Sequence, residues 1–195
     1  MGRDKALLPW PPVPTGSAAA GQTFLSAAIQ ALEPFSELVI VVAGKNESNL
    51  APSVYAAGAN LVRNPAPERG QFSSLQTGLQ AVLSYGRDAA MITLVDRPPI
   101  KAATLKLLCS AFRNSASNIW AVVPEFEGKH GHPFLVAREM IEVFLKAPAD
   151  SVARDIEHQH QSHIEYLAVN DPLVTQNIDT PEDYAALSSL APSPQ

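Results

Sequence analysis

The sequence has little cysteine, no long hydrophobic run and no excess of basic residues, and each absence excludes a class of protein. Its one cysteine, Cys109, rules out disulfide bonds within the chain and zinc sites built from several cysteines. Cys109 falls on the apolar side of an expected helix, so we interpret it as a buried structural thiol. The longest apolar runs are only as long as strands, whereas a transmembrane helix needs roughly 20 residues. No charged start followed by an apolar core marks a secretory signal, and we expect a cytoplasmic protein that does not contact membranes.

The charge balance is acidic, with 14 Lys and Arg residues against 19 Asp and Glu residues and a net charge of -5 at pH 7. This balance argues against nucleic acid as a partner, so any phosphate site must be a local cluster of donors. With 195 residues, 46% of them hydrophobic, the chain is long enough to bury a full core, and we expect one domain over residues 1–195. Prolines gather at the ends of segments, and we expect residues 191–195 to form a disordered tail.

The stretch AMITLV, residues 90–95, is followed at once by Asp96 and then by two prolines. Because it lacks polar alternation, it predicts a central strand buried on both faces of a parallel sheet. The prolines cannot continue the ladder, so Asp96 should stand at the carboxyl end of that strand, where open α/β sheets bind ligands. A carboxylate there suits Mg²⁺, which completes its shell with water and phosphates. The alternative is that Asp96 caps the helix beginning near Ala102 or closes a turn.

Strands and helices alternate along the chain. We expect strands at 38–43, 60–63, 90–95, 119–124, 134–136 and 164–169, and helices at 23–34, 73–83, 102–113, 137–146, 151–157 and from 180 onward. Strands that alternate with helices of about ten residues predict βαβ units with right-handed crossovers. The expected fold class is α/β, a three-layer αβα sandwich around a mainly parallel sheet.

A short basic segment opens the sequence, with Gly2, Arg3 and Lys5 close together. Such a loop suits phosphate binding, because glycine lets backbone N–H groups approach and lysine supplies a point charge. The residue types fit this role, although so short a segment occurs in many chains without it.

Two further groups have open interpretations. Asn177 and Asp179 precede the last expected helix, where they either complete a metal site with Asp96 or order the turn before the helix cap. His130 and His132 flank a glycine, and they either shape a loop at the mouth of a pocket or are ordinary exposed loop histidines.

Five segments bring the interpretation to a known family. They are MGRDKALL, NPAPERGQFSSL, LVDRPP, GHPFLV and IDTPEDY, and they occur in this order. Together they resemble the MobA-like nucleotidyltransferases, especially the molybdenum cofactor cytidylyltransferase branch, over nearly the whole chain. The resemblance implies a Rossmann-like sheet of the nucleotide-diphospho-sugar transferase type and a Mg²⁺-dependent enzyme.

The resemblance also implies which residues bind the nucleotide. A glycine-rich loop with a lysine holds the triphosphate, and a second loop frames the base. The matching residues are Gly2, Arg3, Lys5, Asn64, Gly70 and Ser74. Lys5 is also implied to be catalytic.

The metal and the acceptor have implied residues as well. The strand-end aspartate that is catalytic and binds Mg²⁺ matches Asp96, and the late acidic turn near the metal matches Asn177 and Asp179. The segment on the acceptor side matches His132 and Pro133.

The chain departs from the family pattern in two places. Family members place a central strand and a small-residue turn ahead of the segment that corresponds to MGRDK, so we expect the natural protein to begin upstream, or this chain to be folded but impaired. Asn177 stands where related sugar nucleotidyltransferases often have a metal-binding aspartate, and its oxygen would ligate without a charge.

The resemblance implies attack by an acceptor phosphate on the α-phosphorus of a nucleoside triphosphate, with release of pyrophosphate. CTP is favoured over GTP, the acceptor is the pterin cofactor or another phosphorylated small molecule, and a molybdoenzyme is a partner. Two alternatives remain: a nucleotidyltransferase for a sugar or polyol phosphate, and a catalytically silent carrier that hands the cofactor to a molybdoenzyme.

Overall fold

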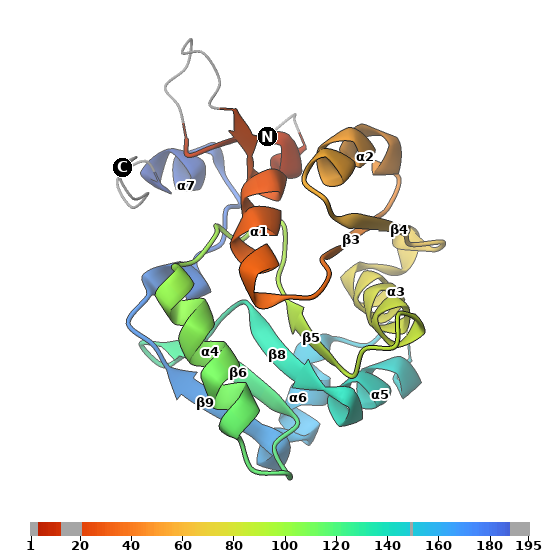
Figure 1. Cartoon of the computed structure of the whole chain (residues 1–195), viewed down its shortest axis with the longest axis vertical. Helices are drawn as coiled ribbons and strands as arrows, with labels where there is room; N and C mark the ends of the chain where they lie inside the picture. The colour runs from red at the N-terminus through yellow and green to blue at the C-terminus, as the bar shows by residue number, and fades with distance from the viewer. Residues whose placement is uncertain (1–3, 13–20, 149, 188–195) are drawn as a thin grey trace.

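The computed structural model describes residues 4–12, 21–148 and 150–187, in which strands and helices alternate (Figure 1). The strands are β1 (Pro9–Trp10), β2 (Gln22–Thr23), β3 (Ile40–Ala43), β4 (Asn60–Arg63), β5 (Ala89–Ile92), β6 (Ala121–Phe126), β7 (Lys129–His130), β8 (Phe134–Ala137) and β9 (Ile164–Ala168). The helices are α1 (Phe24–Leu32), α2 (Glu47–Ala56), α3 (Gln71–Ser84), α4 (Ala102–Asn114), α5 (Arg138–Lys146), α6 (Ala153–Gln159) and α7 (Pro181–Ala186). Single-turn 3-10 helices at Lys5–Leu7, Glu33–Phe35, Pro67–Arg69, Gln161–His163 and Pro172–Thr175 connect them.

The largest sheet has the order β5-β8-β6-β7, and β9 pairs with β6. β8 is antiparallel to both of its neighbours, with Leu135 opposite Met91 of β5 and opposite Val122 of β6. β6 and β9 are parallel, with Val123 opposite Tyr166. β5, β6 and β9 therefore all point the same way, which confirms the expected α/β fold around a mainly parallel sheet.

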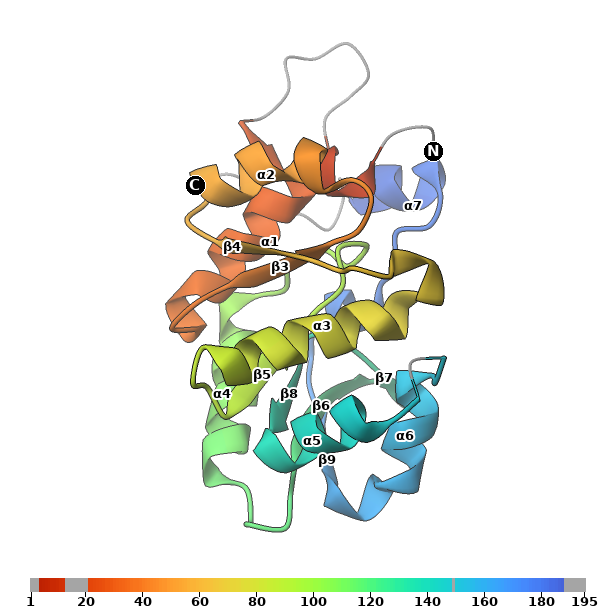
Figure 2. The same ribbon diagram turned by 90° about the vertical axis from the view of Figure 1, so that its right-hand side faces the viewer.

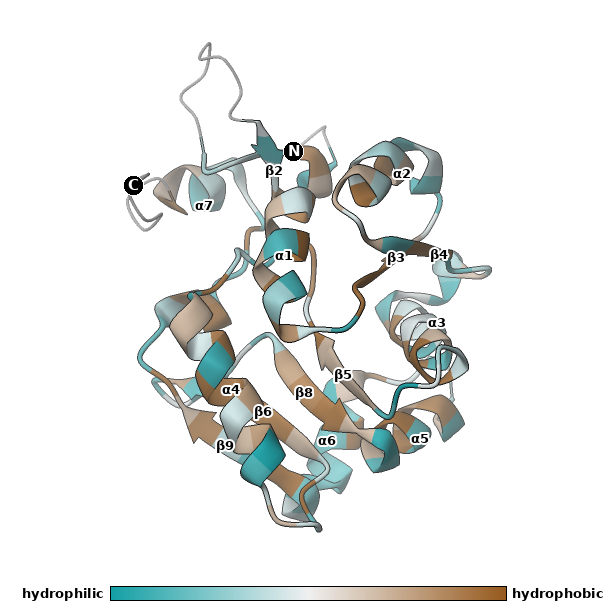
Figure 3. Ribbon diagram, in the orientation of Figure 1, coloured by the Kyte–Doolittle hydropathy of each residue, from teal (hydrophilic) through white to brown (hydrophobic). Residues whose placement is uncertain are grey.

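Alternate residues of this sheet face opposite layers of helices. Val122 packs in one core cluster with Leu108 of α4, and its neighbour Val123 packs in another with Phe144 of α5. The apolar colouring of the strands contrasts with the polar outer faces of the helices (Figure 3). The sheet is the middle layer of an αβα sandwich, as the sequence predicts.

A second pair of strands, β3 and β4, is parallel, with Val42 opposite Val62. Val41 packs with α1 and α2, while Val42 faces α3, where a Cβ added at Gly78 would lie only 3.0 Å from it. Among the described residues β3 pairs with β4 alone and β5 with β8 alone, so no ladder joins the two sheets. α3 instead packs against strands of both (Figure 2).

The prediction for residues 90–95 is wrong in two respects. The strand is β5, which ends at Ile92, so Asp96 lies in a turn beyond the ladder rather than directly at its end. β5 is an edge strand of its sheet among the described residues, its partner β8 is antiparallel, and its side chains are half-buried or exposed. An apolar run reports the hydrophobicity of a segment but not the number of strands beside it.

The start of α3 lies before residue 73, where the sequence predicts it. α3 begins at Gln71 after Gly70, and Ser73 lies within its first turn, where its hydroxyl donates to the Gly70 carbonyl at 2.7 Å. α4 begins at Ala102, as expected, but Asp96 does not cap it. Thr23 caps α1 and Thr180 caps α7, each in a capping box.

A different aspartate stabilises the start of α4. Asp171, which is fully buried, accepts hydrogen bonds from the Lys101 backbone N–H at 3.2 Å and the Thr104 hydroxyl at 2.8 Å. The alternative in which Asp96 caps this helix is therefore wrong, because Asp171 occupies that position from far along the chain.

Cys109 lies on the buried side of α4, as predicted for a structural thiol. Burial raises the pKa of the thiol, which keeps it protonated and unreactive at neutral pH. Within the described residues, no helix has both the length and the apolar character that crossing a membrane requires.

The fold predicts a pH-dependent stability through Glu157 of α6. Burial raises the pKa of Glu157 from 4.5 to about 7, against a smaller lowering by Arg154. The folded protein thus holds this proton more tightly than the unfolded chain, so the stabilisation is complete below pH 4.5 and is lost as the pH rises through 7. We expect Glu157→Gln to leave the free energy of unfolding at pH 4.5 nearly unchanged and to raise it at pH 8 by about 3 kcal/mol.

Urea unfolding at both pH values measures this difference. Glu139→Gln, at an exposed glutamate of α5, is the matched control and should show no such pH dependence. An equal gain at both pH values for Glu157→Gln would contradict the role of burial.

Candidate active site

Two segments far apart in the sequence meet at Asp96. The backbone N–H of Ile178 donates to the Asp96 carbonyl oxygen at 3.0 Å, and the Ile178 side chain is 1% exposed. Asn177 and Asp179, on either side of this buried anchor, are exposed. The anchor therefore holds both polar side chains beside the loop that follows β5.

Lys5 reaches the same place from the start of the chain. Its Nζ lies 3.0 Å from Oδ1 of Asp179. The turn that carries Lys5 is fixed by Asp4, whose side chain accepts from the Ala6 backbone at 3.1 Å and from the Asn46 amide at 2.6 Å. Ala6 itself is buried, so the position of Lys5 is set by a packed turn rather than by its own flexible stem.

Asp96 carries a buried carboxylate oxygen, Oδ1, that has no hydrogen-bond partner among the residues that the structure describes. A buried carboxylate oxygen without a partner is unfavourable unless a cation or donor satisfies it. Asp179 and Asn177 add a second carboxylate and an amide oxygen nearby, and oxygen atoms are the ligands that Mg²⁺ and Mn²⁺ prefer. No cluster of three or more His, Cys, Asp or Glu side chains suited to a metal occurs in residues 4–12, 21–148 and 150–187. The donor set fits a cation that also takes water and phosphate oxygens.

Arg97 and His132 adjoin this acidic group. Burial lowers the pKa of Arg97, while the charges of Asp96 and Asp179 oppose that change. Burial, together with the positive charge of Arg97, lowers the pKa of His132 to about 4, so the imidazole is neutral at pH 7. Within the described part of the chain, Arg97 Nε and His132 Nδ1 are both buried without a hydrogen-bond partner.

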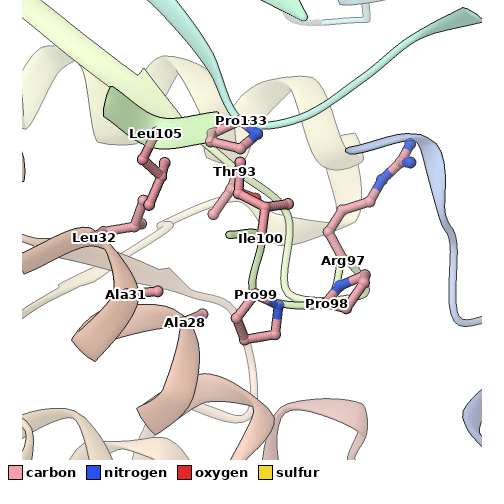
Figure 4. Close-up of a pocket in the computed structure, with 10 residues that line it drawn as sticks. All are labelled: Ala28, Ala31, Leu32, Thr93, Arg97, Pro98, Pro99, Ile100, Leu105 and Pro133. Atoms are coloured by element: carbon pink, nitrogen blue, oxygen red, sulfur yellow. The ribbon is translucent and has the colours of Figure 1, made fainter. Parts of the chain in front are cut away.

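A small pocket adjoins Arg97 and Pro133. Its walls are mostly apolar, and the Arg97 side chain extends away from the apolar wall toward the late loop (Figure 4). The lining residues are Ala28, Ala31, Leu32, Thr93, Arg97, Pro98, Pro99, Ile100, Leu105 and Pro133. The pocket therefore has proline and aliphatic walls, with Arg97 at its edge.

Asn64, Gly70 and Ser74 form a separate group in the loop before α3. The Asn64 amide, 2% exposed, donates to the hydroxyls of Ser73 at 2.9 Å and Ser74 at 3.0 Å, and its carbonyl accepts from the Ala66 backbone at 2.9 Å. Gly70 has φ +91°, a backbone conformation that favours glycine, directly at the start of α3. Asn64 and Ser74 thus order this loop in the structure.

The structure brings most of the predicted site residues together. Lys5, Asp96, Asn177 and Asp179 meet around the Ile178 anchor, and His132 and Pro133 adjoin them through Arg97. Gly2 and Arg3 lie outside the described residues. The loop of Asn64, Gly70 and Ser74 makes no hydrogen bond to Asp96 or Lys5 within the part of the chain that the structure describes.

Sequence reasoning missed Arg97 and Asp171. Arg97 had a signal, since it is a cation that directly follows the candidate metal ligand and precedes two prolines. Asp171 had none, because its partners on α4 are distant in the sequence.

With this geometry in view, the comparison with known families is decisive. Residues 1–164 match the family model described as the MobA-like NTP transferase domain. The chain belongs to the MobA-like NTP transferase family. This MobA-like chain is therefore a nucleotidyltransferase, as the resemblance implies.

Individual relatives agree with this assignment. A protein from Rhodopirellula baltica named "Probable molybdenum cofactor guanylyltransferase" is 26% identical over 190 residues, which cover 94% of this chain and 83% of that protein. The crystal structure of Rv0371c from Mycobacterium tuberculosis H37Rv has a TM-score of 0.76 at 23% identity and covers 96% of this chain and 89% of its own; its complex with manganese has a TM-score of 0.72 at 23% identity, over 95% and 92%. A cytidylyltransferase from Leptospira borgpetersenii has a TM-score of 0.69 at 18% identity, over 97% and 81%. These structures share the fold of this MobA-like chain.

The loop that carries His132 is held by a close backbone contact at Gly131. A Cβ at this position would lie 2.4 Å from the Val174 carbonyl oxygen, to which His132 N–H donates at 2.8 Å. We expect Gly131→Ala to separate these segments and to lower the free energy of unfolding by about 1 to 3 kcal/mol. Gly21→Ala, where no atom lies within 4 Å of the added Cβ, is the matched control. Equal urea midpoints for the two variants would show that the contact is not tight.

Proposed function

We propose that this transferase moves a nucleoside monophosphate from a nucleoside triphosphate to a phosphate of molybdopterin or the molybdenum cofactor, with release of pyrophosphate. The observation that carries the proposal is the buried, unpartnered Oδ1 of Asp96 beside the exposed carboxylate of Asp179, which Lys5 approaches to 3.0 Å. The molybdenum cofactor guanylyltransferase named above supports the class of acceptor. We propose that the whole chain forms a single nucleotidyltransferase domain.

Asp96 and Asp179 are proposed to hold a divalent cation, with Asn177 as a neutral third donor. When bound, such a cation would neutralise charge on the α-phosphate. The manganese complex of the mycobacterial structure supports a divalent ion as the ligand, and Mg²⁺ is the proposed one. Lys5, which pairs with Asp179 in the absence of substrate, would turn to the phosphates and balance the departing pyrophosphate.

The reaction requires positioning more than covalent chemistry. A phosphate monoester is already ionised near neutral pH, so its oxygen attacks without a general base. His132 is neutral at pH 7, and no proton transfer is assigned to it. Gly2, Arg3 and Lys5 are proposed for the triphosphate, Asn64, Gly70 and Ser74 for the base, and His132 and Pro133 for the acceptor.

The proposal predicts a sharp loss of activity at Asp96. We expect Asp96→Ala to lower the rate of metal-dependent pyrophosphate release by at least about a hundredfold, because a main electrostatic group is lost. The midpoint of thermal unfolding should not fall, since Oδ1 makes no hydrogen bond with any described residue. Asp155→Ala, at an exposed aspartate of α6, is the control and should keep normal turnover. A near-normal rate for Asp96→Ala would remove Asp96 from the mechanism.

The nucleotide is proposed to be CTP, from the GQFSSL and GHPFLV segments. GTP is the second candidate, which the guanylyltransferase relative favours. Calorimetric titration with Mg·CTP, Mg·GTP and Mg·ATP separates them, and we expect the tightest binding for Mg·CTP. Tighter binding of Mg·GTP would assign the guanylyl reaction instead, and no binding of any nucleotide would overturn the proposed function.

A further inference from the structure

Buried polar atoms without partners are concentrated at one place in this protein. Among the described residues there are four such side-chain atoms, and three of them belong to Asp96, Arg97 and His132. Folded proteins satisfy nearly all buried polar atoms, so a cluster of unsatisfied ones indicates that a ligand completes the site. A cation accounts for the Asp96 oxygen, but the Nε–H of Arg97 is a donor that needs an acceptor, and His132 Nδ1 also lacks a partner among the described residues.

Those two nitrogen atoms are suited to bind an oxyanion. Arg97 is a permanent cation whose Nε–H has no acceptor among the described residues. His132 is neutral, so one of its ring nitrogens carries a hydrogen, and its buried Nδ1 likewise has no partner there. A guanidinium beside an imidazole, partly shielded by Pro98 and Pro133, is suited to a phosphate group.

The two cations near Asp96 lie in different surroundings. Lys5 borders a small depression together with Asp96, Phe24 and Ile178. Arg97 borders another, with Thr93 and Pro133, on the side of the His132 segment. In an in-line transfer at phosphorus, the attacking group and the leaving group lie on opposite sides of the phosphorus atom. The different surroundings of Lys5 and Arg97 therefore suit one cation to the leaving group and the other to the attacking group.

We propose that Arg97, together with His132, binds the phosphate monoester of the acceptor, the group that attacks the α-phosphorus. This inference rests on the proposed nucleotidyl transfer, in which Arg97 had no assigned substrate contact. An acceptor oxygen forms a new bond to the α-phosphorus, the bond to the bridging oxygen of the β-phosphate breaks, and pyrophosphate leaves with that electron pair. No proton or further reactant is required, and Arg97 fixes the attacking group in place.

The test separates binding of a phosphate monoester from binding of nucleotide. Phenyl phosphate is the monoester probe and Mg·CTP or Mg·GTP, whichever binds the wild-type protein, is the nucleotide probe, both measured at equilibrium by calorimetry. We expect Arg97→Gln to weaken phenyl phosphate binding at least about tenfold and to leave the nucleotide dissociation constant within about twofold, because charge-assisted hydrogen bonds to one ligand are lost. Lys5→Gln should give the reverse pattern.

Kinetics provide the second measurement. With the acceptor varied, Arg97→Gln should raise its KM at least about tenfold, and the KM for nucleotide should stay unchanged. Arg97→Lys keeps the charge but not the planar fork, and it should give an intermediate KM. Thermal unfolding checks that each variant is folded. If Arg97→Gln does not fold, the same measurements are made on Arg97→Lys alone.

Each outcome decides a different question. Weaker nucleotide binding with normal phenyl phosphate binding in Arg97→Gln would place Arg97 on the triphosphate and overturn the inference. Wild-type protein that binds nucleotide but no phenyl phosphate would also overturn it, while leaving the proposed function intact. Wild-type protein that binds phenyl phosphate but no nucleotide would reject the proposed function and retain an oxyanion site at Arg97.

Discussion

The candidate site depends on one backbone hydrogen bond, from Ile178 N–H to the carbonyl oxygen of Asp96. The bond joins the loop after β5 to a segment that follows the last strand, β9. Its register is fixed because Ile178 packs into the same core cluster as Leu105 of α4 and Val122 of β6. With Ile178 inside, the residues on either side of it must face outward, and Asp179 is thereby presented to Lys5. Burial of one aliphatic side chain thus sets the spacing of the acidic group.

A second buried contact connects this group to the loop of His132. Asp171 holds the start of α4 and, through its backbone carbonyl, accepts from Val174 N–H at 3.3 Å. Val174 in turn accepts from His132 N–H, and Gly131 is the residue that allows this close approach. The proposed metal side and the proposed acceptor side are therefore parts of one packed unit. A change in the Pro172–Thr175 turn would therefore shift residues on both the proposed metal side and the proposed acceptor side, although none of the turn's side chains is assigned to the reaction.

The sequence was sufficient where the signal is local. The caps at Thr23 and Thr180 follow from residue types next to each other, and the alternation of strands and helices gives the layers of the fold. The sequence was insufficient where a structural feature depends on contacts between residues far apart in the chain. The apolar segment before Asp96 has the composition of a central strand, yet its place in a sheet depends on which edges are occupied. Ser73 has the residue type of a helix cap, but the left-handed conformation of Gly70 starts the helix earlier. The proposed role of Arg97 in binding the acceptor depends on the buried His132 beside it, and no local sequence pattern shows that the two residues are neighbours.

The charges of the described residues support the proposal that a cation binds the site before a phosphate chain does. Three carboxylates, those of Asp96, Asp179 and Asp183, face the two cations Lys5 and Arg97. Hydrogen bonds from the backbone and side chain of Thr180 hold the pKa of Asp183 below its usual value, so this carboxylate stays charged at neutral pH. Among the described residues this group carries one more negative than positive charge, which disfavours a triphosphate, and the proposed divalent cation would reverse that sign. In the proposed reaction, the nucleotide would therefore arrive with its metal or after it.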